Sequence, residues 1–81
     1  MIVTVRLFAA LRERAGTAEI SLEAPDESTV AAIESLVVQR HPELSDLLSK
    51  SAPAVNRAYA SRQTVLHDGD ELALIPPVSG G

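Results

Sequence analysis

The stretch Ile2-Val3-Thr4-Val5-Arg6-Leu7-Phe8 alternates between apolar and polar residues near the start of the chain. The apolar side chains at positions 3, 5 and 7 share one face, and Thr4 and Arg6 share the other. Successive side chains of a strand point to opposite faces, so this period of two predicts a β-strand with one buried face.

Two further elements are predicted directly after this strand. Residues 9–15 are good helix formers, and Gly16 follows at the position where many helices end, which predicts a short helical turn. The segment from Ala18 to Glu23 alternates again, with Ile20 and Leu22 facing inward. Because only a short connection separates them, the two strands are expected to form an antiparallel pair.

The principal helix is predicted from residue 30 onward. A turn at residues 25–27 precedes Ser28, the expected N-cap, with Thr29 as the competing choice. Apolar residues then fall at positions 30, 33, 36 and 37, which is helical spacing. Pro42 closes a helix of about three turns, because the residue before a proline avoids the α region.

The second half of the chain gives weaker signals until its end. Residues 43–51 predict another short helical turn around three leucines, and residues 53–57 predict a strand that residues 58–60 could extend. Residues 61–66 are the least defined. Asp68-Gly69-Asp70 predicts a tight turn, and Glu71 to Ile75 predicts the last strand.

The order strand, strand, helix, strands indicates an α+β fold. A mixed sheet of four or five strands with one principal helix on one face is a β-grasp, or ubiquitin-like, architecture. The first and last strands are then expected to lie adjacent and parallel at its centre. Residues 1–75 would form this domain, and residues 76–81 would form an extended tail.

The tail reads Pro76-Pro77-Val78-Ser79-Gly80-Gly81. Proline fixes φ and lacks an N–H, so the pair favours an extended chain outside the sheet, and glycine has no Cβ to obstruct a narrow passage. Six extended residues reach roughly 20 Å, enough to place the terminal carboxylate inside another protein. The alternative is a frayed chain end without a function.

Composition excludes several classes of function. The 81 residues, beginning with Met, predict one complete small domain, and 46% hydrophobic residues are enough for a core. No apolar run approaches the ~20 residues that span a bilayer, and the start does not resemble a signal peptide, so we expect a cytoplasmic protein without a membrane partner. The net charge of −4 argues against nucleic acid.

The chain contains no cysteine, which excludes disulfides, thiol catalysis and cysteine-based metal sites. His41 and His67 are far apart and lack a ligand pattern, so no metal site is predicted. No glycine-rich phosphate loop is present, and any nucleotide chemistry would have to come from a partner.

Three segments resemble the small, sulfur-carrying subunit of molybdopterin synthase, a ubiquitin-like protein. They are residues 7–16 (LFAALRERAG), Ala54-Val55-Asn56, and residues 68–81 (DGDELALIPPVSGG). Many ubiquitin-like proteins end in Gly-Gly, whereas Pro-Pro-Val before it is more specific to this family. The related thiamine-type sulfur carriers generally lack the Pro-Pro.

The resemblance implies a sulfurtransferase mechanism. A carboxylate is ionised at pH 7 and is a poor electrophile, so it must be activated. In the family, an adenylyltransferase resembling ubiquitin-activating enzyme uses ATP to adenylate the terminal glycine, here Gly81. A sulfur donor then replaces AMP to give a thiocarboxylate. This sulfur enters the large synthase subunit, which supplies the acid–base groups, and builds the molybdopterin dithiolene from cyclic pyranopterin monophosphate.

The resemblance also implies the partners and the site residues. The family forms a heterotetramer of two large and two small subunits, and the small subunit binds no cofactor of its own. Docking is expected through an apolar patch on the sheet face away from the helix. The implied docking residues are Phe8, Tyr59, Ile75, Pro76, Pro77, Val78 and Ser79, and the reactive end is Gly80 and Gly81.

Other interpretations remain open at this point. Phe8 and Tyr59 could instead fill the core. The activated terminus would equally serve a protein modifier joined through Gly81 to lysines, and a thiamine-type carrier is a close relative. A ubiquitin-like binding module with an inert tail is a further possibility.

Overall fold

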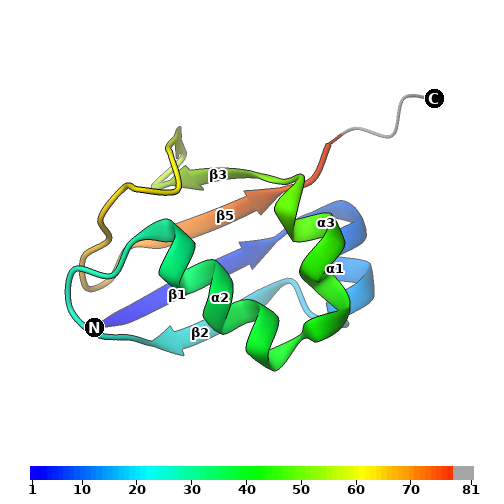
Figure 1. Ribbon diagram of the computed structural model, residues 1–81, viewed down its shortest axis with the longest axis horizontal. Coiled ribbons are helices and arrows are strands. Elements are labelled where there is room, and N and C mark those ends of the chain that lie inside the picture. The colour runs from blue at the N-terminus through cyan, green and yellow to red at the C-terminus, as the bar shows by residue number, and fades with distance from the viewer. Residues whose placement is uncertain (78–81) are drawn as a thin grey trace.

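The computed structural model describes residues 1–77, and within them the chain forms a five-stranded mixed sheet with α2 and α3 lying across one face (Figure 1). The elements in chain order are β1 Ile2–Leu7, α1 Ala9–Ala15, β2 Glu19–Glu23, α2 Val30–Arg40, the 3-10 helix η1 Pro42–Leu44, α3 Ser45–Ser49, β3 Ala52–Val55, β4 Ala58–Tyr59 and β5 Glu71–Ile75.

The strand order is β2-β1-β5-β3-β4. β1 pairs antiparallel with β2 and parallel with β5, and β3 pairs antiparallel with both β5 and β4. This confirms the predicted β-grasp architecture, including the parallel pair at the centre of the sheet. Because Leu7 lies opposite Leu74, the ends of β1 and β5 meet at the same edge.

The core lies between the sheet and the helices. The alternating apolar side chains of β1, β2 and β5 point into it, and α2 contributes Val30, Ile33 and Val37. α1, η1, α3 and the loop before β5 add Leu11, Leu44, Leu48 and Leu66, all nearly or fully buried. Each such side chain contributes about 1.5–3 kcal/mol by leaving water. Within residues 1–77, no helix covers the opposite face of the sheet (Figure 1).

The N-cap of α2 is Thr29, the competing choice, and the expectation of Ser28 is wrong. The Thr29 hydroxyl accepts a hydrogen bond from the backbone N–H of Ala32 at 3.2 Å. The Ser28 hydroxyl instead donates a hydrogen bond to the backbone carbonyl of Pro25 at 2.7 Å, within the turn that precedes the helix.

Residues 52–59 form a hairpin, which corrects the prediction of one strand extended through residues 58–60. Asn56 and Arg57 both have positive φ, 49° and 72°, and Val55 pairs with Ala58 across them. Two positive φ values are typical of the two-residue turn that matches the twist of a hairpin. The usual signal for this turn is Asn-Gly, and Arg57 at the glycine position obscured it.

The loop at residues 60–66 accepts hydrogen bonds from the first turn of α2. Its carbonyls at Thr64 and Arg62 accept hydrogen bonds from the backbone N–H groups of Val30 and Ala31 at 3.0 and 2.9 Å. These donors have no partner within the helix, so the loop satisfies them. Among the described residues, none of the helices has the length and apolar character needed to cross a membrane.

Candidate functional site: an apolar hollow on the open face of the sheet

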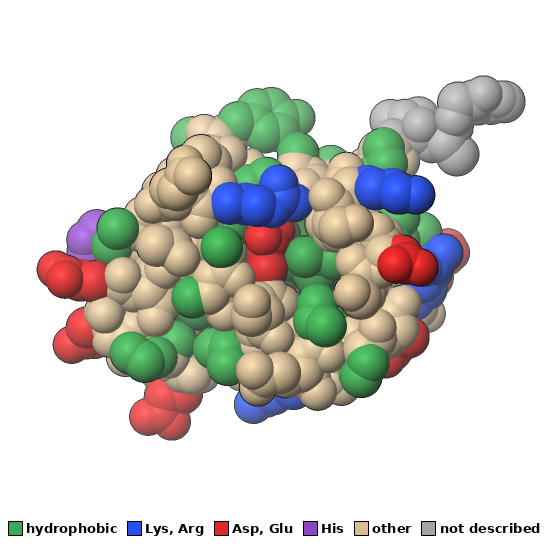
Figure 2. Space-filling model, in the orientation of Figure 1, with side chains coloured by type: hydrophobic (Ala, Val, Ile, Leu, Met, Phe, Trp, Pro, Cys, Tyr) green, Lys and Arg blue, Asp and Glu red, His purple; other side chains and the backbone are tan. Residues whose placement is uncertain are grey.

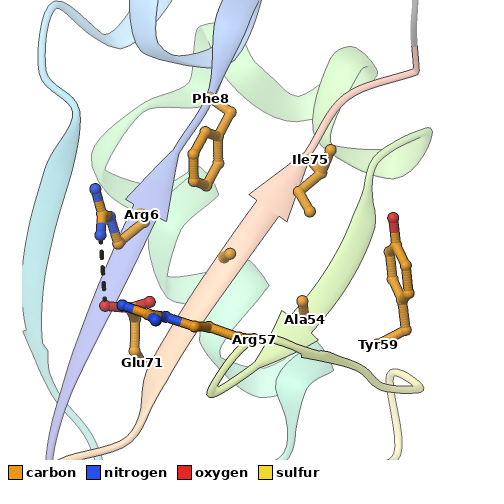
Figure 3. A pocket seen from close by; sticks show the side chains of 8 residues that line it. Arg6, Phe8, Ala54, Arg57, Tyr59, Glu71 and Ile75 are labelled. Carbon is orange, nitrogen blue, oxygen red and sulfur yellow. Dashed lines mark ion pairs between the residues drawn. The ribbon is translucent and has the colours of Figure 1, made fainter.

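A shallow hollow of ≈ 340 Å³ lies on the sheet face that no helix covers (Figure 3). Ala73 of β5 pairs with Ala54 of β3 on one side and with Arg6 of β1 on the other. The side chains of the two alanines are small and form the floor of the hollow. Larger side chains rise around this floor. The lining residues are Arg6, Phe8, Ala54, Arg57, Tyr59, Glu71, Ala73 and Ile75.

The three docking residues inside the domain that the resemblance implied all line this hollow. Phe8 directly follows β1 and is 37% exposed, and Tyr59 on β4 is 79% exposed. Ile75, the last residue of β5, is half-buried. Phe8 and Tyr59 therefore do not fill the core, and that alternative is wrong. The binding role of the three residues stays a prediction.

A second hollow of ≈ 710 Å³ adjoins the root of the tail. Phe8 and Ile75 line both hollows, and they lie close together because β1 and β5 run parallel and end at the same edge. Pro76 and Pro77 line the second hollow, together with Ala9, Ala10, Glu13, Leu47 and Lys50. One continuous surface thus runs from β4 to the point where the tail begins. Val78, Ser79, Gly80 and Gly81 lie outside the described residues.

Charged groups border the end of the first hollow that is remote from the tail. Arg6 Nη1 lies 3.7 Å from Glu71 Oε2, and the Arg6 guanidinium carbon lies 5.8 Å from the centre of the Phe8 ring. Arg57 reaches over the hollow from the hairpin, and no ion pair or side-chain hydrogen bond engages its guanidinium within residues 1–77. The lining is therefore apolar toward the tail, and its far end carries two guanidinium groups and one carboxylate.

The hairpin is held against β5 by a small polar network. Asn56 Nδ2 donates to Asp70 Oδ1, and Asn56 Oδ1 accepts from the backbone N–H of Glu71, both at 3.0 Å. The backbone N–H of His67 donates to Asp70 Oδ2 at 2.8 Å. These donors, the His67 N–H first and Asn56 second, hold the pKa of the Asp70 carboxyl below its usual range. Asn56 and Asp70 thereby fix the position of the hairpin that carries Arg57 and Tyr59.

The sequence prediction did not single out Arg6, Arg57, Glu71, Ala54 or Ala73 as site residues. The alternation of side chains already indicated part of the site. Arg6 and Phe8 point to the same side of the first strand, and Ala73 and Ile75 point to the same side of the last strand. Arg57 could not be placed because the hairpin was not predicted, and Ala54 could not be placed because the pairing of β3 with β5 was not known. Within residues 1–77, no three His, Cys, Asp or Glu side chains are grouped so that they could hold a metal ion.

Comparisons with known proteins agree with this geometry. A family model described as the ThiS family matches residues 5–81. The molybdopterin synthase sulfur carrier subunit of Arabidopsis thaliana is 35% identical over 79 residues, which is 98% of this chain and 82% of the relative.

Two solved structures share the fold along their whole length. SAMP1 (small archaeal modifier protein 1) of Haloferax volcanii superimposes with a TM-score of 0.91 at 31% identity, covering 100% of both chains. A chain from the complex of subunits 1 and 2 of the molybdopterin-converting factor of Helicobacter pylori has a TM-score of 0.72 at 28% identity, again over 100% of both chains. The chain therefore belongs to the ThiS family and has the ubiquitin-like β-grasp fold of its relatives.

Proposed function

We propose that this protein is the sulfur carrier subunit of a molybdopterin synthase. The observation that carries the proposal is the continuous surface formed by the two hollows, which joins an uncovered apolar sheet face to the root of the C-terminal tail. A partner docked on this surface would receive the tail in a fixed direction. The name of the Arabidopsis thaliana relative and the two-subunit complex from Helicobacter pylori support the same assignment.

The chemistry of this proposal takes place at Gly81. An adenylyltransferase partner joins the terminal carboxylate to AMP and releases pyrophosphate from ATP. A sulfide-level sulfur donor then displaces AMP and leaves a thiocarboxylate. The thiocarboxylate sulfur attacks cyclic pyranopterin monophosphate in the large subunit, and hydrolysis returns Gly81 to a carboxylate. Two such deliveries complete the dithiolene, so this chain supplies a consumed donor and binds no cofactor itself.

A role as a protein modifier is the second candidate. The likeness to SAMP1, named a small archaeal modifier protein, favours it. Both roles need the same activated Gly81 and differ in what attacks it, a lysine amine or a sulfur donor. Covalent conjugates in cell extract, lost when Gly81 is deleted, would mark a modifier.

The docking surface can be tested with Ile75→Asp. A carboxylate at the point where the two hollows meet must be desolvated under a bound partner, so we expect the affinity for the large synthase subunit to fall by at least ~10-fold, equivalent to about 1.4 kcal/mol. Isothermal titration calorimetry measures this loss. Val65→Asp is the control, because Val65 is an exposed aliphatic residue that lines neither hollow.

Circular dichroism of both variants must show the folded spectrum. Wild-type affinity of a folded Ile75→Asp protein would contradict the proposed docking surface. Equal losses from the Ile75 and Val65 variants would contradict it as well, because the effect would then not depend on position.

A further inference from the structure

The tip of the β3–β4 hairpin holds an arginine in an unfavourable backbone conformation. Arg57 has a φ of 72°, in the left-handed region that is unfavourable for a residue with a Cβ. Glycine is the usual residue at this place in a two-residue hairpin turn. An observed outlier of this kind supports a functional hypothesis for the side chain that is retained there.

The side chain of Arg57 lies on the docking surface. It extends from the hairpin toward the Glu71 end of the hollow, above the floor formed by Ala54 and Ala73 (Figure 3). Glu71 is already paired with Arg6 at 3.7 Å, and Arg57 makes no ion pair within residues 1–77. Among the residues that line the hollow, the two guanidinium groups of Arg6 and Arg57 outnumber the single carboxylate of Glu71.

This local charge is opposite to that of the whole molecule. The chain carries a formal net charge of −4, so its average field repels an acidic partner. Because Glu71 is paired with Arg6, the Arg57 guanidinium is left to attract a negative group of the partner at this end of the hollow. Charges at the edge of an interface set the register and the rate of association more than they add affinity.

We propose that Arg57 is a specificity determinant of the docking surface, and that the partner places an aspartate or glutamate carboxylate against it. The planar guanidinium can donate two parallel hydrogen bonds to a carboxylate, a geometry that lysine cannot reproduce. This contact fixes the position of the partner at the far end of the hollow. The apolar end holds the partner next to the root of the tail. This inference rests on the proposed function, because it assumes the same surface and the same partner.

Calorimetric titration of the full chain with the large synthase subunit of the same organism tests the inference. At about 0.05 M salt, Arg57→Gln should bind roughly 3–10-fold more weakly than wild type, and at about 0.5 M salt the difference should largely disappear because ions screen the pair. Arg14→Gln is the matched control, since Arg14 is an exposed arginine of α1 that lines neither hollow, and it should bind like wild type at both salt concentrations.

Arg57→Gly distinguishes the effect of the backbone conformation on stability from the effect of the side-chain charge on binding. It relieves the unfavourable φ, so it should be more stable than wild type in urea and yet bind more weakly at low salt. Binding of Arg57→Gln equal to wild type, or weakened by the same factor at both salt concentrations, would overturn the role of charge and leave the proposed function intact. Failure of the wild-type chain itself to bind the large subunit would instead overturn the proposed function.

Discussion

Asn56 links the β3–β4 hairpin to the start of β5 through its side chain and its backbone N–H. Its amide group donates to Asp70 and accepts from the backbone of Glu71, and its backbone N–H donates to the carbonyl of Glu71 at 2.9 Å. Its φ of 49° lies in the left-handed region, which asparagine adopts more readily than most residues. Asn56, which belongs to one of the segments that carry the family resemblance, thus has a structural role, since it fixes the hairpin that borders the proposed docking surface.

Asn56→Ala should lower the free energy of unfolding by about 2 kcal/mol. The change removes two side-chain hydrogen bonds and leaves alanine in a left-handed conformation, and each effect costs about 1 kcal/mol. Urea unfolding followed by circular dichroism measures the loss. Gln63→Ala is a control at an exposed loop position whose side chain makes no hydrogen bond within residues 1–77, and it should change little.

Asn56→Gly distinguishes the two contributions, because glycine accepts the positive φ and lacks the amide. We expect its stability to lie between those of wild type and Asn56→Ala. A glycine variant as stable as wild type would show that the side-chain hydrogen bonds contribute nothing.

At the scale of elements, an ion pair holds the loop at residues 60–66 against the helices. Arg62 Nε lies 3.0 Å from Glu34 Oε1 of α2, and Arg62 Nη2 donates to the carbonyl of Ser51 at 3.1 Å, just before β3. Acidic side-chain atoms lie deep between α2 and α3, below basic ones (Figure 2). Glu34 is only 6% exposed, and its Oε2 is buried without a hydrogen-bond partner within the described residues.

Burial raises the pKa of Glu34 above the usual value of 4.5, although the charge of Arg62 opposes the shift. The folded chain therefore binds this proton more tightly than the unfolded chain does. Stability from this group is fully present below pH 4.5 and is lost as the pH rises through the higher folded pKa.

The difference in unfolding free energy between wild type and Glu34→Gln should therefore grow in favour of wild type as the pH falls from 7 toward 4.5. Urea titrations at several pH values measure this difference. Glu23→Gln, at an exposed position of β2, is the control, and its difference in unfolding free energy from wild type should stay the same across this pH range. A difference that is flat or shrinks on acidification would contradict the buried state of the Glu34 carboxyl.

The strands and helices could be predicted because their periodicity is local. The period of two in β1, β2 and β5 and the helical spacing of α2 identified their inner faces without structural information. The Glu34–Arg62 pair could not be predicted, since 28 residues separate its members and neither lies in a motif. The hairpin was missed because Arg57 stands where glycine would have marked the turn.

The candidate site was predictable only in part, for a related reason. Period two assigned Ile75 to the face opposite the core, but the hollow depends on which strands are neighbours. The placement of Ala54 beside Ala73 follows from the pairing of β3 with β5, which a single sequence does not reveal. The family resemblance supplied Phe8 and Tyr59, and the structure showed that their side chains lie outside the core.

At the scale of the whole molecule, the two faces of the sheet are arranged for different tasks. Helices α2 and α3 cover one face and bury the core, while the other face stays open and leads to the tail root (Figure 1). The parallel pairing of β1 and β5 places Phe8 and Ile75 at the edge where the tail leaves the domain. The fold therefore places the open sheet face and the root of the tail in a fixed relation, which fits the proposed role as a carrier.

The intact mass of the protein tests the central claim most directly. The chain would be incubated with the proposed adenylyltransferase partner, ATP and a sulfide source, and compared with a variant lacking Gly81. We predict a shift equal to one oxygen replaced by one sulfur, which needs both ATP and the partner and is absent from the variant. An unchanged mass, with a partner that thiocarboxylates another carrier in the same assay, would contradict the sulfur-carrier function.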